Sequence, residues 1–150
     1  MRKSRFLSLS VPLLLALPGI GLCDGIDDCR TVAAILSVYP PLEVVASAAP
    51  VRAAPDAAER PGCRVQASGP AARIFGEVDP AEAVWIYFAG TGWEEDARLS
   101  ADGPGTMSFA FRRDGVLCHT EGGAHAWLED GEAFVSERYG IEVACAAHPE

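Results

Sequence analysis

Residues 106–121 read TMSFAFRRDGVLCHTE, and this stretch decides the fold. Two runs of strand-forming residues flank Asp114-Gly115. This pair is favoured in two-residue type I′ turns because both central positions need a positive φ. The stretch therefore predicts a tight β-hairpin, in which Arg113 lies opposite Val116 and Phe111 lies opposite Cys118.

Alternation along this hairpin gives it one apolar face. The side chains on that face are Met107, Phe109, Phe111, Val116 and Cys118. The opposite face is mixed and is expected to be partly solvated; it carries Ser108, Ala110, Arg112, Leu117, His119 and Glu121. Because the apolar face must be buried, we expect the hairpin to form the centre of a sheet.

A helix over residues 79–89 is expected to cover that face. Asp79 can cap it, Pro80 suits the first helical position, and Glu82 favours the positive end of the helix. The apolar side of this helix comprises Ala81, Val84, Trp85 and Phe88, and Gly90 is expected to close it in the left-handed conformation. The predicted fold is α+β: a mostly antiparallel sheet of four or five strands with this helix packed across one face.

The chain before residue 63 is expected to contribute little to the sheet. Asp27 or Asp28 can cap a helix that runs to about Tyr39. From there to residue 62 the chain is rich in alanine and proline. A short strand or turn at residues 42–46 is possible, but the segment is interpreted as a semi-extended tether.

Three further segments complete the expected sheet and its connections. Residues 63–68 and 139–145 alternate with a period of two, which predicts strands. A strand is also predicted from Trp93 to Leu99. Residues 122–137 are interpreted as a long connection, and such connections are often functional or disordered.

The first 23 residues have the layout of a secretory signal peptide: three basic residues, an apolar run, and small residues after Pro18. The apolar run is shorter than the ~20 residues that span a bilayer. Cleavage after Gly21 or after Cys23 fits, and a loose lipobox that would lipidate Cys23 is the third reading. The expected organisation is a signal peptide at 1–23, a helix and tether at 24–62, and one α+β domain at 63–150.

Removal of the signal leaves nine arginines, no lysine and 21 acidic residues, a net charge of −12. This acidity argues against nucleic acid and anionic membranes as partners, unless Cys23 is lipidated, and it favours a cationic protein. Acidity that simply keeps an exported protein soluble is the alternative. We expect the protein in the periplasm or secreted.

Four cysteines remain after cleavage at Cys23, which in an oxidising compartment predicts two disulfides. Three pairings are possible. Cys118 and Cys145 lie on the apolar faces of strands that should enter the same core, so we predict a Cys118–Cys145 bond. Cys29 then pairs with Cys63, which would hold the N-terminal helix to the first strand.

No motif for catalysis, metal binding or cofactor binding stands out. Cys118, His119, Glu121 and His125 are close in sequence, but alternation sends Cys118 to the face opposite His119 and Glu121. The sequence has no nucleophile elbow, phosphate loop, dinucleotide fingerprint or His-Glu-x-x-His. We therefore expect no catalytic residues, no metal ligands and no cofactor.

The candidate binding residues are Trp127, Glu129, Asp130 and Glu132, an aromatic side chain within an acidic segment. They favour a non-catalytic exported module that binds another protein, such as an inhibitor of a cationic secreted enzyme like a lysozyme. The alternative is a small periplasmic hydrolase or metal-dependent enzyme. Convergence of His119, Glu121 and His125 in a pocket would favour the enzyme, and an exposed Trp127 in an acidic patch would favour the binding module.

The second half of the chain resembles a group of small exported bacterial proteins of unassigned function. The likeness covers residues 92–145 and is carried by Gly92-Trp93, the ADGPG segment, the FAFRRDGVLC hairpin and the closing YGIEVAC. It implies export and one small domain. These motifs consist of turn and core residues, so the likeness implies no mechanism.

Overall fold

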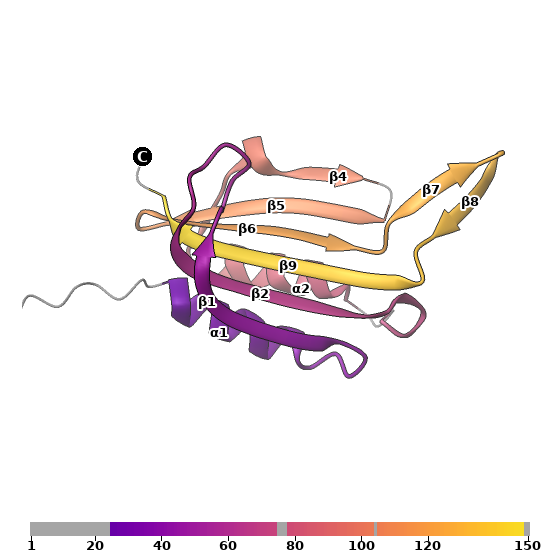
Figure 1. Ribbon diagram of the computed structural model, residues 1–150, viewed down its shortest axis with the longest axis horizontal. Helices are drawn as coiled ribbons and strands as arrows, with labels where there is room; N and C mark the ends of the chain where they lie inside the picture. Colours follow the sequence, from indigo (N-terminus) through magenta and orange to yellow (C-terminus); the bar gives the residue numbers. More distant parts are fainter. Residues whose placement is uncertain (1–24, 75–77, 104, 149–150) are drawn as a thin grey trace, which may run out of the picture.

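The structure is a computed structural model that describes residues 25–74, 78–103 and 105–148, and its fold is α+β (Figure 1). The expected signal peptide lies outside the described residues. Two α-helices in the described chain pack on one face of an antiparallel sheet: α1 (Gly25–Leu36) and α2 (Pro80–Gly90). The strands are β1 (Glu43–Val51), β2 (Arg60–Pro70), β3 (Glu94–Glu95), β4 (Ala101–Gly103), β5 (Thr106–Arg113), β6 (Val116–Gly123), β7 (Ala126–Glu129), β8 (Glu132–Val135) and β9 (Arg138–Ala147).

Seven of these strands form one sheet in the order β1-β2-β9-β6-β5-β3, with β4 also paired to β5. All the pairings are antiparallel. Within the described residues, strands β7 and β8 pair only with each other, and they project from one end of the sheet (Figure 1). The prediction of a mostly antiparallel α+β fold is confirmed, but the sheet has more strands than the four or five expected, and α1 packs on it as well as the one helix expected there.

The central hairpin β5–β6 forms as predicted. Arg113 lies opposite Val116 and Phe111 lies opposite Cys118. Asp114 and Gly115 have φ values of 50° and 74°, as a type I′ turn requires. The local turn chemistry therefore fixes the register of β5 and β6, which lie between β9 and β3 in the sheet.

Helix α2 covers the apolar face of this hairpin. The rings of Phe88 and Phe111 stack with centroids 5.4 Å apart, and both side chains are buried. Trp85 also contacts Phe111, with ring centroids 6.3 Å apart, but 38% of its surface stays exposed. The helix thus buries Phe88 fully and Trp85 only along one edge.

The start of α2 matches its sequence signal, and its end does not. The Asp79 carboxylate accepts a hydrogen bond from the backbone N–H of Ala81 at 2.8 Å, and Pro80 occupies the first turn. Gly90 was expected to end the helix in the left-handed conformation, but it is the last helical residue. Gly92 is the glycine that takes a positive φ, 80°.

Helix α1 begins earlier than predicted, at Gly25, and Asp28 does not cap it. Asp28 is buried instead, and its carboxylate accepts hydrogen bonds from Arg113 at 3.1 Å and from the Tyr87 hydroxyl at 2.8 Å. The Arg113 guanidinium also lies 4.5 Å from the centre of the Trp93 ring. This network joins α1, α2 and the turn of the central hairpin.

Both predicted disulfides are confirmed. Cys118 and Cys145 are register partners on β6 and β9, and Cys29 of α1 is bonded to Cys63 of β2. Cys63 is in turn the register partner of Cys145. The sulfur atoms of Cys29, Cys63 and Cys145 lie within 4.8 Å of one another, so the two bonds form a single buried cluster.

The segment interpreted as a tether contains strand β1, which corrects that reading. Alanine and proline have low β-propensity, but pairing along all nine residues with β2 outweighs it. Pro50 lies opposite Pro61, and two prolines cannot form a hydrogen-bonded pair. The alternation then directs the backbone groups of Val44, Ala46 and Ala48 away from β2, toward the free edge of the sheet.

The strand predicted from Trp93 to Leu99 is mostly absent. Within this segment, Glu94 and Glu95 are the residues that pair with β5, and residues 97–99 form a 3-10 turn. The buried Asp96 carboxylate explains the turn, since it accepts hydrogen bonds from the side chains of Arg98 at 3.0 Å and Arg112 at 2.7 Å.

The sheet face opposite the helices is divided between a buried end and an open end. At the buried end the connection between β1 and β2 packs over the strands, and Leu117 has no exposed surface. Leu117 and Ala110 were expected on a partly solvated face, so their burial corrects that expectation. The remaining part of the face carries polar side chains.

Candidate functional site

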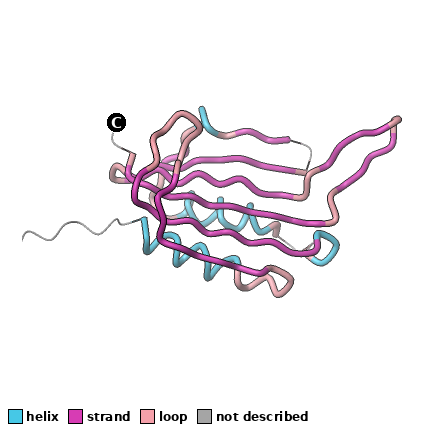
Figure 2. Tube along the Cα trace, viewed as in Figure 1, coloured by secondary structure: helices cyan, strands magenta, loops and turns pink. Residues whose placement is uncertain are grey.

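The four predicted binding residues lie together on the β7–β8 hairpin, which replaces the long connection expected at 122–137. Figure 2 shows two strands joined by a short turn at the far end. Asp130 and Gly131 form that turn, with φ values of 50° and 84°. This is a second Asp-Gly pair with positive φ at both residues, and it is the sequence signal that would have predicted the hairpin in place of the expected connection.

The hairpin carries exposed apolar side chains on both faces. On one face the rings of Trp127 and Phe134 stack 5.8 Å apart, and His125 stacks on Trp127 at 6.0 Å. Trp127 is 42% exposed and Phe134 is 38% exposed. The other face presents Leu128 and Val135, which are 76% and 55% exposed. Sequence reasoning identified Trp127 and missed the other three apolar residues.

The tip of the hairpin is acidic. Glu129 lies directly opposite Glu132, and Asp130 occupies the turn between them. Like charges placed directly opposite each other destabilise a strand pair. None of these three carboxylates forms a salt bridge with the described part of the chain. The tip therefore presents uncompensated negative charge beside an aromatic stack.

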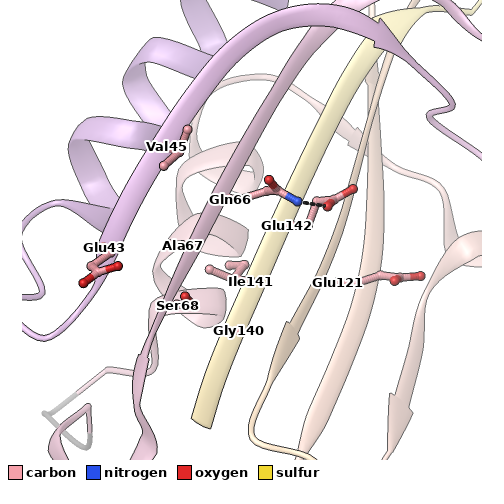
Figure 3. A pocket seen from close by; sticks show the side chains of 9 residues that line it. All are labelled: Glu43, Val45, Gln66, Ala67, Ser68, Glu121, Gly140, Ile141 and Glu142. Atoms are coloured by element: carbon pink, nitrogen blue, oxygen red, sulfur yellow. Dashed lines mark hydrogen bonds between the residues drawn. The ribbon is translucent and has the colours of Figure 1, made fainter.

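A second candidate region is the open end of the polar sheet face (Figure 3). A cavity of about 590 Å³ lies there, with Glu43, Glu121 and Glu142 among its lining residues. Glu121 and Glu142 are register partners on β6 and β9. Glu142 accepts a hydrogen bond from Gln66 at 2.7 Å, shown as a dashed line in Figure 3.

The residues proposed for enzyme chemistry do not all converge. Glu121 lines one cavity with His119 and a different one with His125. Within the described ranges, one group of three or more possible metal ligands lies close enough to share an ion, and it consists of the disulfide-bonded cysteines. His119, Glu121 and His125 are thus not brought together as a ligand set.

One pair on the open face has catalytic character. The Ser108 hydroxyl lies 2.9 Å from Nε2 of His119. A histidine in this position can act as a base toward a serine. Among the described residues, however, no carboxylate forms a hydrogen bond with His119 to orient it.

The largest pKa shifts belong to groups that hold the fold together. Hydrogen bonds from Arg98, opposed by burial and reinforced by Arg112, lower the pKa of Asp96. Burial and then the hydrogen bond to Asp79 raise the pKa of the Tyr139 hydroxyl. Tyr139 donates to Asp79 at 2.7 Å and accepts from the N–H of Ala81 at 3.0 Å, so it supports the cap of α2.

Comparison with known proteins gives no family. No protein-family model, no curated protein and no solved structure matches the chain. No described helix is long and apolar enough to cross a membrane. The two disulfides indicate an oxidising location outside the cytoplasm.

Proposed function

We propose that the protein is an exported, non-catalytic module that binds a cationic protein through the β7–β8 hairpin. The observation that carries this proposal is the exposure of apolar side chains on both faces of a hairpin that projects from the sheet. An isolated two-stranded hairpin is marginally stable in water. A partner that covers the hairpin would bury the apolar surface and stabilise it.

The charge of the hairpin supports a basic partner. Glu129, Asp130 and Glu132 surround the tip, and the whole chain has a formal charge of −9, or −12 without its first 23 residues. Complementary charge accelerates association and favours one partner over others. A cationic secreted enzyme, such as a lysozyme, has the required chemistry, and the module would act as its inhibitor.

Direct binding to purified proteins tests the proposal. The mature protein is titrated by calorimetry against a panel of cationic secreted enzymes that includes a lysozyme, with an acidic protein of similar size as the control. We expect binding that weakens as salt is raised, because screening acts on exposed charges. Absence of binding across the cationic panel would contradict the proposal.

A pair of variants tests whether the hairpin makes the contact. Replacing both Trp127 and Phe134 by alanine removes the aromatic stack, and affinity should fall by about tenfold or more. Ile86→Ala on α2 is the matched control, since Ile86 is also exposed but lies away from the hairpin. Equal affinities for the two variants would exclude the hairpin as the contact.

The second candidate is a small hydrolase, favoured by the contact between Ser108 and His119. Ser108→Ala would then abolish turnover of ester substrates while the protein stays folded. Under the binding proposal the same variant binds the cationic enzyme with unchanged affinity. Measuring ester turnover and enzyme binding on the Ser108→Ala variant therefore distinguishes the two functions.

Export to the periplasm or the medium is part of the proposal. The disulfides support an oxidising location, and the layout of residues 1–23 supports a cleaved signal. Mass spectrometry of the intact exported protein should give a chain that begins near Leu22 or Asp24. Retention of Met1 would contradict cleavage, and an added lipid mass on Cys23 would identify a lipoprotein.

A further inference from the structure

A cavity of about 620 Å³ lies at the foot of the β7–β8 hairpin. Its volume is within the ~300–1,000 Å³ that is common for ligand sites. The hairpin itself contributes part of the wall, through Ala126 and Val135, and the adjoining strands contribute Met107 and Tyr139. A partner lying along the hairpin would therefore reach the cavity without leaving the surface of the protein.

The cavity continues the apolar layer between the sheet and the helices. Gly122 lies beneath the first turn of α2, where an added Cβ would come within 3.3 Å of the Ala81 side chain. Met107 and Tyr139 lie on the same apolar sheet face and line the cavity next to this contact. The apolar layer thus opens to the outside where the hairpin emerges.

Two carboxylates border these apolar walls, and no basic side chain is among the described lining residues. Asp79 is already engaged, because it accepts hydrogen bonds from Tyr139 and from the N–H of Ala81. Asp102 is exposed and forms no salt bridge with any described residue. The cavity therefore combines an apolar interior with an uncompensated negative charge at its rim.

We propose that this cavity takes a lysine or arginine side chain of the cationic partner. Such a side chain has an apolar stem and a charged end, and when it lies across the cavity from the hairpin side its stem covers the apolar wall and its end reaches the charged rim. The stem packs against Met107, Val135 and Tyr139, and the charged end reaches Asp102. This inference rests on the proposed function and names the chemistry that the hairpin region recognises in its partner.

Nuclear magnetic resonance titration of the mature protein with Nα-acetyl-lysine methylamide tests the cavity alone. We expect the methyl signals of Met107 and Val135 to shift. The matching norleucine amide, which keeps the stem and lacks the charge, should bind at least about fivefold more weakly. Equal binding of the two amides, or shifts confined to other regions, would overturn the inference.

Asp102→Asn should weaken lysine amide binding by about fivefold, because it removes the rim charge without changing the shape of the side chain. Asp56→Asn is the matched control, an exposed carboxylate in the β1–β2 connection that does not line the cavity. Equal effects of the two substitutions would mean that total charge rather than the cavity attracts the amine, which overturns the inference.

A cavity-filling variant connects the cavity to the protein partner. Ala126→Leu places extra volume in the cavity wall, whereas Ala133→Leu adds it on the same hairpin face outside the cavity. We expect only Ala126→Leu to weaken binding of the cationic enzyme, by about tenfold.

The outcomes separate the two proposals. If the enzyme binds and both leucine variants bind it equally, the hairpin is the contact and the cavity inference is wrong. If the lysine amide occupies the cavity but no cationic protein binds, the proposed function fails and the cavity is a site for free amines, which also overturns the inference.

Discussion

The two hairpins β5–β6 and β7–β8 have the same type of turn but differ in the elements that pack against them. Each turns at an Asp-Gly pair with positive φ at both residues. In β5–β6 the aromatic face is buried under α2, and Phe111 is 2% exposed. In β7–β8 no described element covers the aromatic pair, and Phe134 is 38% exposed. Turn chemistry decides that a hairpin forms, and the neighbouring elements decide whether it is core or contact surface.

The largest expected difference lies between the aromatic residues of the two hairpins. Phe111→Ala should lower the free energy of unfolding by about 3–5 kcal/mol, because it leaves a cavity beneath α2. Phe134→Ala should change it by less than about 0.5–1 kcal/mol, since the side chain is already partly in water. Urea unfolding of the mature protein measures both. Similar losses for the two variants would show that β7–β8 belongs to the cooperative core.

The second difference is covalent, because a disulfide ties β6 of the first hairpin to β9. Cys118→Ser should cost about 3–4 kcal/mol and weaken the sheet itself. Cys29→Ser should mainly release α1, and it leaves the Cys63 thiol beside Cys145. Attack of the Cys63 thiolate on Cys145 would break the Cys118–Cys145 bond and release the Cys118 thiol, so peptide mapping without reduction should recover some Cys63–Cys145 bond. Recovery of Cys118–Cys145 alone would argue against exchange within the cluster.

The third difference concerns the pH dependence of stability, because the Asp96 carboxylate forms a salt bridge with Arg112 of β5. Its pKa is lowered in the folded protein, so its contribution to stability is complete above the unfolded value of ~3.9 and is lost as the pH falls toward the folded value. Wild type should therefore be more stable than Asp96→Asn at pH 7, and the difference should begin to shrink below about pH 4 and continue to shrink as the pH falls further toward the folded pKa. Thermal unfolding at a series of pH values measures this. A constant difference across that range would exclude the carboxylate charge as the cause.

The smallest expected effect is at the acidic tip. Glu132→Lys turns a repulsive pair with Glu129 into an attractive one and should stabilise β7–β8 by about 0.2–1 kcal/mol. Amide hydrogen exchange should slow in this hairpin and stay unchanged in β5–β6. The same substitution should weaken binding to the cationic partner, whereas Glu132→Gln should lie between the two. Slower exchange throughout the sheet would mean that the hairpins are not independent.

The sequence predicts β5–β6 well because two local signals agree there. The Asp-Gly turn and strict alternation both specify the same register, and the apolar face needs the cover that the Asp79 helix provides. In β7–β8 the turn signal at Asp130-Gly131 stands without alternation, since Trp127 and Leu128 place apolar side chains on both faces. Such a pattern is not distinguishable by periodicity from an irregular connection.

Strand β1 and the cavity at the foot of the hairpin escape prediction for a different reason. The alanines of β1 have little preference for a strand, and the pairing with β2 across the sheet supplies the decision. The cavity joins residues as distant in the chain as Asp79 and Tyr139, which only the strand order brings together. The clustering of Trp127 with its acidic neighbours was predictable, because these residues lie close together in the sequence, between positions 127 and 132.

The free edge of β1 has a consequence for how this protein behaves in concentrated solution. Strand edges are commonly protected from pairing with other molecules by proline, lysine, bulges or inward-pointing charge; β1 has Pro50 near its end, but residues 44–49 contain neither a proline nor a charged side chain. Along residues 44–49, protection comes from repulsion between whole molecules, which share a large net negative charge. That repulsion disappears near the isoelectric point, which is about 4.7 for the full chain and lower without its first 23 residues, and high salt screens it at any pH. Acidification in salt should therefore join molecules edge to edge along β1, and a single lysine in place of Ser47 should keep them apart.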